Sequence, residues 1–121
     1  MDSELLARRV VLVADDCPLV RRANAELCRG MGLSVLEAAD GHEAIQALHA
    51  RSDISLVVTD FDMPGASGID VARAAGPRCQ VVLSSIERVG GHESEPNIVR
   101  FVPKQGGPQQ IADCLRELMA T

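Results

Sequence analysis

The chain has 121 residues, a net charge of -5 at pH 7 and only two aromatic side chains. This length suits one domain with a core of its own, and the hydrophobic content of 46% excludes a disordered chain. An acidic chain poor in aromatic residues lacks the charge and stacking surfaces of nucleic-acid-binding proteins, so direct binding to nucleic acid is not expected. No apolar run is long enough for a membrane span or a signal peptide, which predicts a cytoplasmic location without membrane attachment.

Two kinds of apolar segment alternate along the chain. The first kind is short and continuous, which is typical of strands buried on both faces; these segments are Val10–Ala14, Leu33–Ala38, Ser55–Asp60, Val81–Leu83 and Ile98–Val102. The second kind has apolar residues at helical spacing; these segments run from Pro18 to Met31 with Gly32 as C-cap, from Asp40 as N-cap to about Arg51, from Ile69 to Ala75, and from Pro108 onward. The alternation predicts an α/β domain with a parallel sheet covered on both faces. Glu87 to Asn97 lacks an apolar stripe and is expected to be a loop or a frayed helix.

Polar residues stand at the carboxyl ends of four of the five expected strands. They are Asp15 and Asp16, Asp60, Ser84 and Ser85, and Lys104. Because the carboxyl ends of parallel strands share one edge of a sheet, these side chains should converge. Three carboxylates there would repel one another, and Mg²⁺, which prefers oxygen ligands, would relieve that repulsion. The set suits a phosphoryl group, with Asp60 as the attacking carboxylate and Lys104 as a balancing charge.

Each of these signals has a simpler interpretation when it is taken alone. An aspartate pair before a helix usually caps it, a serine at a strand end usually forms a turn, and a lysine there is usually solvated. Their joint placement at four strand ends favours the functional interpretation.

The ordered set resembles the receiver domain of the two-component response regulators over essentially the whole chain. The segments that carry the resemblance are Val11–Asp16, Thr59–Pro64 with Gly68, Leu83–Ser85 and Phe101–Lys104. Ala14–Arg21 and Lys104–Gly106 are similar to the LuxR-type branch, whose receivers usually precede a DNA-binding helix-turn-helix domain. The resemblance implies one receiver domain over residues 1–121, either alone or as the N-terminal part of a longer regulator. It also implies a flavodoxin-like, doubly wound sheet of five parallel strands in the order 2-1-3-4-5.

The resemblance further implies a role for each matching residue. Asp60 matches the phosphoacceptor, Asp16 a direct Mg²⁺ ligand, and Asp15 its acidic neighbour that acts largely through water. Asp62 matches the residue whose backbone carbonyl completes the metal site. The remaining matches are the invariant lysine, the hydroxyl that moves to the phosphoryl group and the aromatic residue that turns inward; they are Lys104, Ser84 with Ser85 as the alternative, and Phe101.

The implied protein is a switch that catalyses only its own phosphorylation and dephosphorylation. Its expected partners are a sensor histidine kinase or a phosphotransfer protein, and a second copy of itself after phosphorylation. Transcription is the expected output. Two departures from the family pattern are Phe101, where tyrosine is commoner, and Gln105, where many members have proline.

Two alternative functions fit parts of the pattern. Asp60–Asp62 resembles the nucleophile motif of haloacid dehalogenase-type phosphatases, but Pro64 stands where threonine or valine is usual. A phosphatase would also leave the aspartate pair at Asp15 and Asp16 without a role. The other alternative is a receiver-like module that binds proteins and is never phosphorylated, which the irregular segment from Glu87 to Asn97 keeps open.

Overall fold

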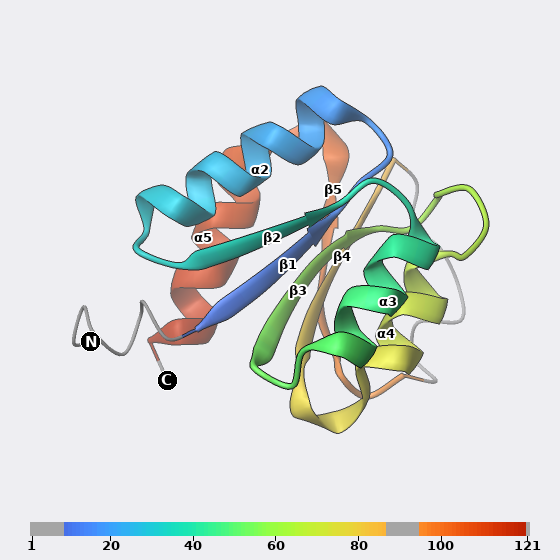
Figure 1. Ribbon diagram of the computed structural model, residues 1–121. Coiled ribbons are helices and arrows are strands. Elements are labelled where there is room, and N and C mark those ends of the chain that lie inside the picture. Colours follow the sequence, from blue (N-terminus) through green and yellow to red (C-terminus); the bar gives the residue numbers. More distant parts are fainter. Residues whose placement is uncertain (1–8, 87–94, 121) are drawn as a thin grey trace.

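The computed structural model describes residues 9–86 and 95–120, in which five parallel strands form one sheet (Figure 1). The strands are β1 (Val10–Ala14), β2 (Ser34–Ala38), β3 (Ile54–Asp60), β4 (Gln80–Ser85) and β5 (Ile98–Pro103). Their spatial order is β2-β1-β3-β4-β5, with every neighbouring pair parallel. The flavodoxin-like order is therefore confirmed. The order reverses beside β1, so the carboxyl ends of β1 and β3 lie at the point where α/β sheets usually bind ligands.

Helices cover both faces of the sheet (Figure 1). One face carries α2 (Pro18–Gly30) and α5 (Pro108–Met119), and the other carries α3 (Gly41–Ala50) and α4 (Gly68–Ala75). Short 3₁₀ turns follow α4 and β5; they are η1 (Gly76–Arg78) and η3 (Lys104–Gly106). No helix in the described part of the chain is long and apolar enough to cross a membrane.

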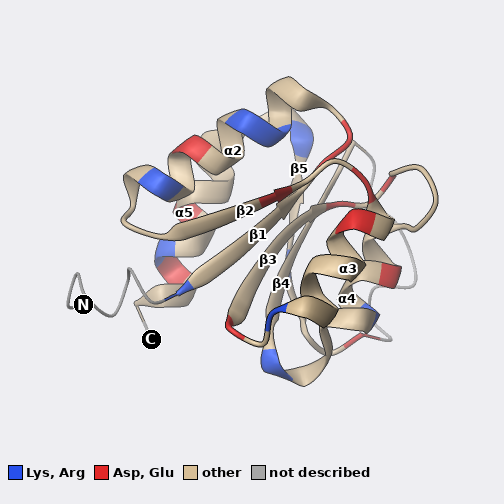
Figure 2. Cartoon of the chain, in the orientation of Figure 1, with Lys and Arg blue, Asp and Glu red and all other residues tan. Residues whose placement is uncertain are grey.

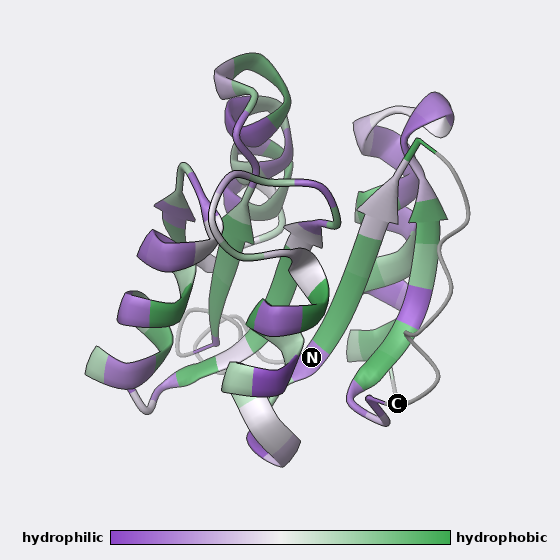
Figure 3. Ribbon diagram, turned by 90° about the vertical axis from the view of Figure 1, so that its right-hand side faces the viewer, coloured by the Kyte–Doolittle hydropathy of each residue, from purple (hydrophilic) through white to green (hydrophobic). Residues whose placement is uncertain are grey.

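The core has two layers because successive side chains of a strand point to opposite faces. Val11 and Val58 pack with α2 and α5, whereas Leu12 and Val57 pack with α3 and α4. All four are almost completely buried. Figure 3 shows the apolar strands enclosed between helices whose outer faces are hydrophilic. This double burial explains why the strands are continuous apolar runs rather than alternating ones.

The helix ends follow local capping rules, with one correction to the prediction. Asp40 caps α3 as expected, since its carboxylate accepts a hydrogen bond of 2.8 Å from the Glu43 amide. The helix α2 ends earlier than expected, with Met31 as its C-cap rather than Gly32. Gly32 follows with a φ of 90°, and its amide bonds the carbonyl of Arg29. A glycine just beyond the C-cap supplies this left-handed conformation at little steric cost.

The prediction for Glu87 to Asn97 falls largely on residues 87–94, which lie outside the described residues. At the end of that segment, the Asn97 side-chain amide donates to the carbonyls of Ala72 and Gly76 at 2.7 and 2.9 Å. These bonds tie the start of β5 to the end of α4.

Candidate functional site

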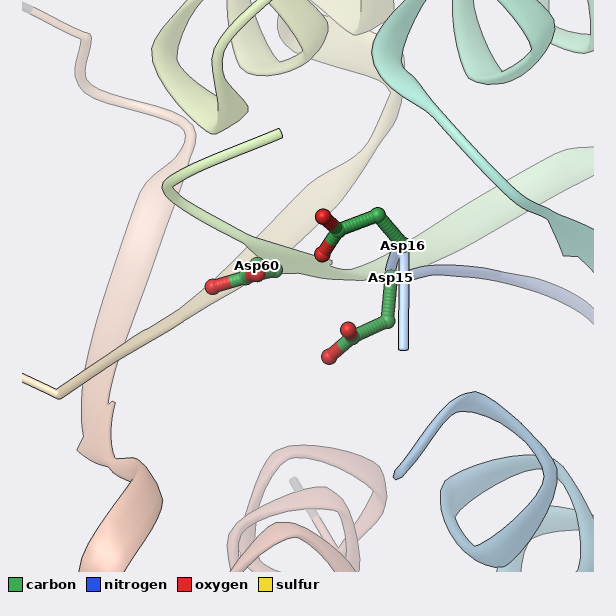
Figure 4. A group of neighbouring side chains, drawn as sticks. All are labelled: Asp15, Asp16 and Asp60. Atoms are coloured by element: carbon green, nitrogen blue, oxygen red, sulfur yellow. The ribbon is translucent and has the colours of Figure 1, made fainter. Parts of the chain in front are cut away.

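Three carboxylates meet at the carboxyl ends of β1 and β3 (Figure 4). Asp15 and Asp16 directly follow β1 and Asp60 ends β3, and carboxylate oxygens of all three lie within 4.8 Å of one another. Asp15 and Asp60 are only 2% and 6% exposed, whereas Asp16 is exposed. The convergence expected from the sequence is therefore present, because β1 and β3 are neighbours in the sheet.

Lys104 brings a positive charge to two of these carboxylates from the far edge of the sheet. It begins η3 after β5, and its Nζ lies 3.2 Å from Asp15 Oδ2 and 3.1 Å from Asp60 Oδ2. One ammonium therefore bridges the buried pair. Charge-assisted bonds of this kind offset part of the cost of burying carboxylates.

The electrostatics of Asp60 and Lys104 show that this compensation is partial. Burial raises the pKa of Asp60, as does the nearby Asp15 carboxylate, and the hydrogen bond from Lys104 opposes them without reversing the shift. For Lys104, burial alone would lower the pKa. The bonds and charges of Asp60 and Asp15 outweigh burial, so the net shift is upward. The lysine thus stays protonated, while the charge on Asp60 remains unfavourable.

The site has the donor chemistry of a Mg²⁺ site. The carboxylates of Asp15, Asp16 and Asp60 face one ammonium, which leaves two of their negative charges unbalanced. In the described part of the chain, no group donates a hydrogen bond to the Asp16 side chain or forms an ion pair with it. A cleft of about 470 Å³ opens beside these groups, lined by Asp16, Asp60, Phe61, Asp62, Ser85, Ile86 and Lys104. An all-oxygen set with this charge fits a hard divalent cation.

Two serines at the end of β4 lie beside the carboxylates but line different cavities. Ser84 pairs in register with Asp60, and its carbonyl accepts a 2.8 Å bond from the Phe61 amide. It lines a cavity of about 220 Å³ between α2 and α5 that Lys104 also borders. Ser85 lines the acidic cleft itself. Both are 7% exposed, so burial does not distinguish the two hydroxyls: Ser84 is the register partner of Asp60, whereas Ser85 lines the acidic cleft.

Residues 11–116 match the family of response regulator receiver domains. The chain is a receiver domain of this family. The receiver is 31% identical over 124 residues to the transcriptional activator protein ExaE of Pseudomonas putida, a match that covers 91% of this chain and 55% of that protein. It is also 40% identical over 65 residues to the chemotaxis protein CheY of Pseudomonas aeruginosa, covering 53% and 52% of the two chains. The matches span about half the length of these two relatives.

A LuxR-family regulator is among the structural neighbours of the receiver. The response regulator of Aurantimonas sp. SI85-9A1 superposes with a TM-score of 0.75, covering 92% of this chain and 84% of that chain. At 23% identity the likeness shows the shared fold alone. Receiver domains act as phosphoacceptor switches in two-component signalling and communicate with histidine kinases or phosphotransfer proteins.

Phe101 lies apart from the acidic cleft of the receiver. It pairs with Leu83 across β4 and β5, and it lines a shallow hollow against α5 with Gln110 and Glu117. Its ring is half-buried. Any inward movement of Phe101 would therefore start from this outer position.

Side-chain chemistry in the sequence does not indicate three residues that shape the site, which are Arg21, Gly41 and Gly68. The Nη1 of Arg21 donates a 3.0 Å hydrogen bond to the Asp15 carbonyl. Gly41 and Gly68 allow close backbone contacts: a Cβ on Gly68 would lie 2.5 Å from the Asp60 carbonyl, and one on Gly41 would overlap the Ala66 carbonyl. Gly68 was noted only through the family resemblance. The two glycines thus allow the segment that follows Asp60 to pack closely against α3 and the start of α4.

Proposed function

We propose that Asp60 accepts a phosphoryl group from a histidine kinase or a phosphotransfer protein, with Mg²⁺ bound at the acidic cleft. The observation that carries this proposal is the position of Asp60: a buried carboxylate at a strand end, bonded to Lys104 and within 4.8 Å of two more carboxylates. Asp16 and Asp60 would be direct ligands, Asp15 would act through water, and Asp62 would contribute its backbone carbonyl. The bound Mg²⁺ would supply positive charge to the phosphoryl oxygens.

The chain's own residues account for the transfer step. A carboxylate oxygen of Asp60 donates an electron pair to phosphorus, and the bond between phosphorus and the donor's imidazole nitrogen breaks. The electron pair of that bond returns to the imidazole, and Asp60 becomes an acyl phosphate. Lys104 already contacts Asp60 Oδ2, so its ammonium is placed to stabilise charge on the transferring group. Water later hydrolyses the acyl phosphate and restores the carboxylate.

The proposed switch couples this modification to an output. The hydroxyl of Ser84, or that of Ser85, would move to the phosphoryl group, and Phe101 would turn inward into the space released. The proposed output is transcription, through a DNA-binding domain that follows the receiver in a longer cytoplasmic regulator. The similarity to the transcriptional activator ExaE supports this output. Phosphorylation-dependent pairing of two receivers is a further part of the proposal.

Phosphorylation by a small acyl-phosphate donor tests the proposal. The wild-type receiver, incubated with Mg²⁺ and the donor, should gain one hydroxylamine-labile phosphoryl group by mass spectrometry. Asp60→Asn should gain none, and omission of Mg²⁺ should reduce the yield strongly. An unmodified wild type would favour the module that only binds proteins. Steady turnover of a phosphate ester would favour the phosphatase instead.

A further inference from the structure

The exposed carboxylate of Asp16 is held differently from its two neighbours. Lys104 bonds both Asp15 and Asp60, which fixes those side chains. Among the described residues, no side chain or amide bonds the Asp16 carboxylate, although like charges surround it. Repulsion among these like charges does not favour the position of the exposed Asp16 carboxylate beside the other two. Its position therefore depends on the backbone on either side of Asp16.

Both peptide groups that flank Asp16 have fixed partners. Arg21 Nη1 donates a 3.0 Å hydrogen bond to the Asp15 carbonyl, which belongs to the preceding peptide group. The Cys17 amide, which belongs to the following peptide group, donates a 2.9 Å bond to Asp15 Oδ1. The Asp15 amide donates to the Ala38 carbonyl of β2 at 3.1 Å. The direction of the Asp16 side chain is thus set from both sides, and Arg21 provides the contact on the N-terminal side.

Arg21 is itself held in place. Its Nε lies 3.4 Å from Glu37 Oε1 on β2, and its side chain is 18% exposed. A guanidinium has several donors in a rigid plane, so one group can bond the carbonyl and the carboxylate together. Arg29 pairs with the same glutamate at 3.2 Å, but its side chain is 48% exposed. The bond to the Asp15 carbonyl comes from Arg21. Arg29 thus offers a matched control.

We propose that Arg21 is a positioning residue that orients Asp16 for metal binding by fixing the peptide group between Asp15 and Asp16. This inference rests on the proposed Mg²⁺ site. If Arg21 positions Asp16, its removal should weaken metal binding. If Arg21 acts only through its charge, its removal should have the opposite effect on metal affinity. Removing a cation beside a metal site should by itself strengthen metal binding, because it removes like-charge repulsion. The direction of the change therefore separates positioning from simple electrostatics.

Metal affinity of the full chain provides the test. Mg²⁺ and Mn²⁺ titrations by calorimetry should show binding about tenfold weaker in Arg21→Met than in wild type, at the lower end of the range for residues that orient metal ligands. Arg21→Lys keeps the positive charge but lacks the planar set of donors, so its metal affinity should lie between those of wild type and Arg21→Met. Arg29→Met, which loses only its pair with Glu37, should change affinity less than about twofold. Unchanged or tighter binding in a folded Arg21→Met would overturn the inference, as would an equal loss in Arg29→Met.

Amide NMR spectra of the metal-free protein give an independent readout. The Asp16 and Cys17 amide signals should shift or broaden in Arg21→Met and remain in place in Arg29→Met. If Arg21→Met does not fold, Arg21→Lys carries the same comparison, and wild-type affinity with unmoved amides in that variant contradicts the inference. If the wild type binds neither Mg²⁺ nor Mn²⁺, the proposed function itself is contradicted. If the wild type binds metal and the Arg21 variant binds it equally well, the Mg²⁺ site stands and only the proposed role of Arg21 is wrong.

Discussion

The apolar bodies of the strands and two carboxylates at their carboxyl ends are both buried but have opposite effects on stability. Leu12 and Val57 are fully buried apolar side chains, and their removal from water favours folding. Asp60 at the end of β3 and Asp15 directly after β1 are nearly as buried, yet burial of a carboxylate opposes folding. Figure 2 shows the acidic residues at the strand ends beyond largely uncharged strand bodies. The sheet thus supplies the stability that holds an unfavourable cluster of charge in place.

Truncation of the core should have the largest effect on stability. Leu12→Ala removes a fully buried side chain between the sheet and α3, so it should lower the free energy of unfolding by about 2–5 kcal/mol. Leu19→Ala is the control, since Leu19 is 82% exposed, and it should change stability by less than about 0.5 kcal/mol. Urea titrations measure both. Equal losses in the two variants would show that the strand bodies do not carry the stability.

Removal of the bridging lysine should have the next largest effect. Lys104→Met leaves Asp15 and Asp60 buried without their shared cation, and should cost about 1–3 kcal/mol in metal-free protein. In the folded protein the pKa of Lys104 is raised above its ordinary value of 10.5. The stability that Lys104 contributes is therefore complete below pH 10.5, and it is lost as the pH rises through the raised pKa of the folded state. Chemical denaturation across alkaline pH measures the difference between variant and wild type. A difference that persists unchanged after Lys104 has deprotonated would contradict this account.

Neutralising the acceptor should produce a smaller change of opposite sign. Burial raises the pKa of Asp60 above its ordinary value of 3.8, so the folded state favours the protonated form. In metal-free protein, the free energy of unfolding should therefore increase as the pH falls through the raised pKa of Asp60. This increase is complete below the ordinary pKa of 3.8. At neutral pH, Asp60→Asn should melt at a higher temperature than wild type without metal. A lower melting temperature would show that the bond from Lys104 outweighs burial.

Much of this arrangement could be predicted from the sequence because strands and strand ends have local signatures. The continuous run before Asp60 predicts a buried strand, and a polar residue that ends such a run lies at the ligand-binding edge of a parallel sheet. Asp15, Asp16 and Lys104 were located in the same way. The convergence of these residues follows from the topology rather than from any one segment.

The unpredicted features depend on how elements meet. The bond from Arg21 to the Asp15 carbonyl requires the rotation of α2 about its axis, which helical spacing does not specify to one residue. The choice between Ser84 and Ser85 depends on which face each side chain takes at the last positions of β4. The close approach of Gly41 to the Ala66 carbonyl requires the packing of α3 against a loop. None of these features has a signature within its own segment.

The melting temperature in the presence of Mg²⁺ and beryllofluoride, a mimic of the acyl phosphate, tests the central claim most directly. The account predicts that both additions together stabilise the wild type, by about 1.4 kcal/mol when the ligand is at ten times its dissociation constant. Asp60→Asn should gain much less, because the mimic has no carboxylate to bind. A wild type that does not respond, or an Asp60→Asn variant that responds equally, would contradict a phosphoryl site at Asp60.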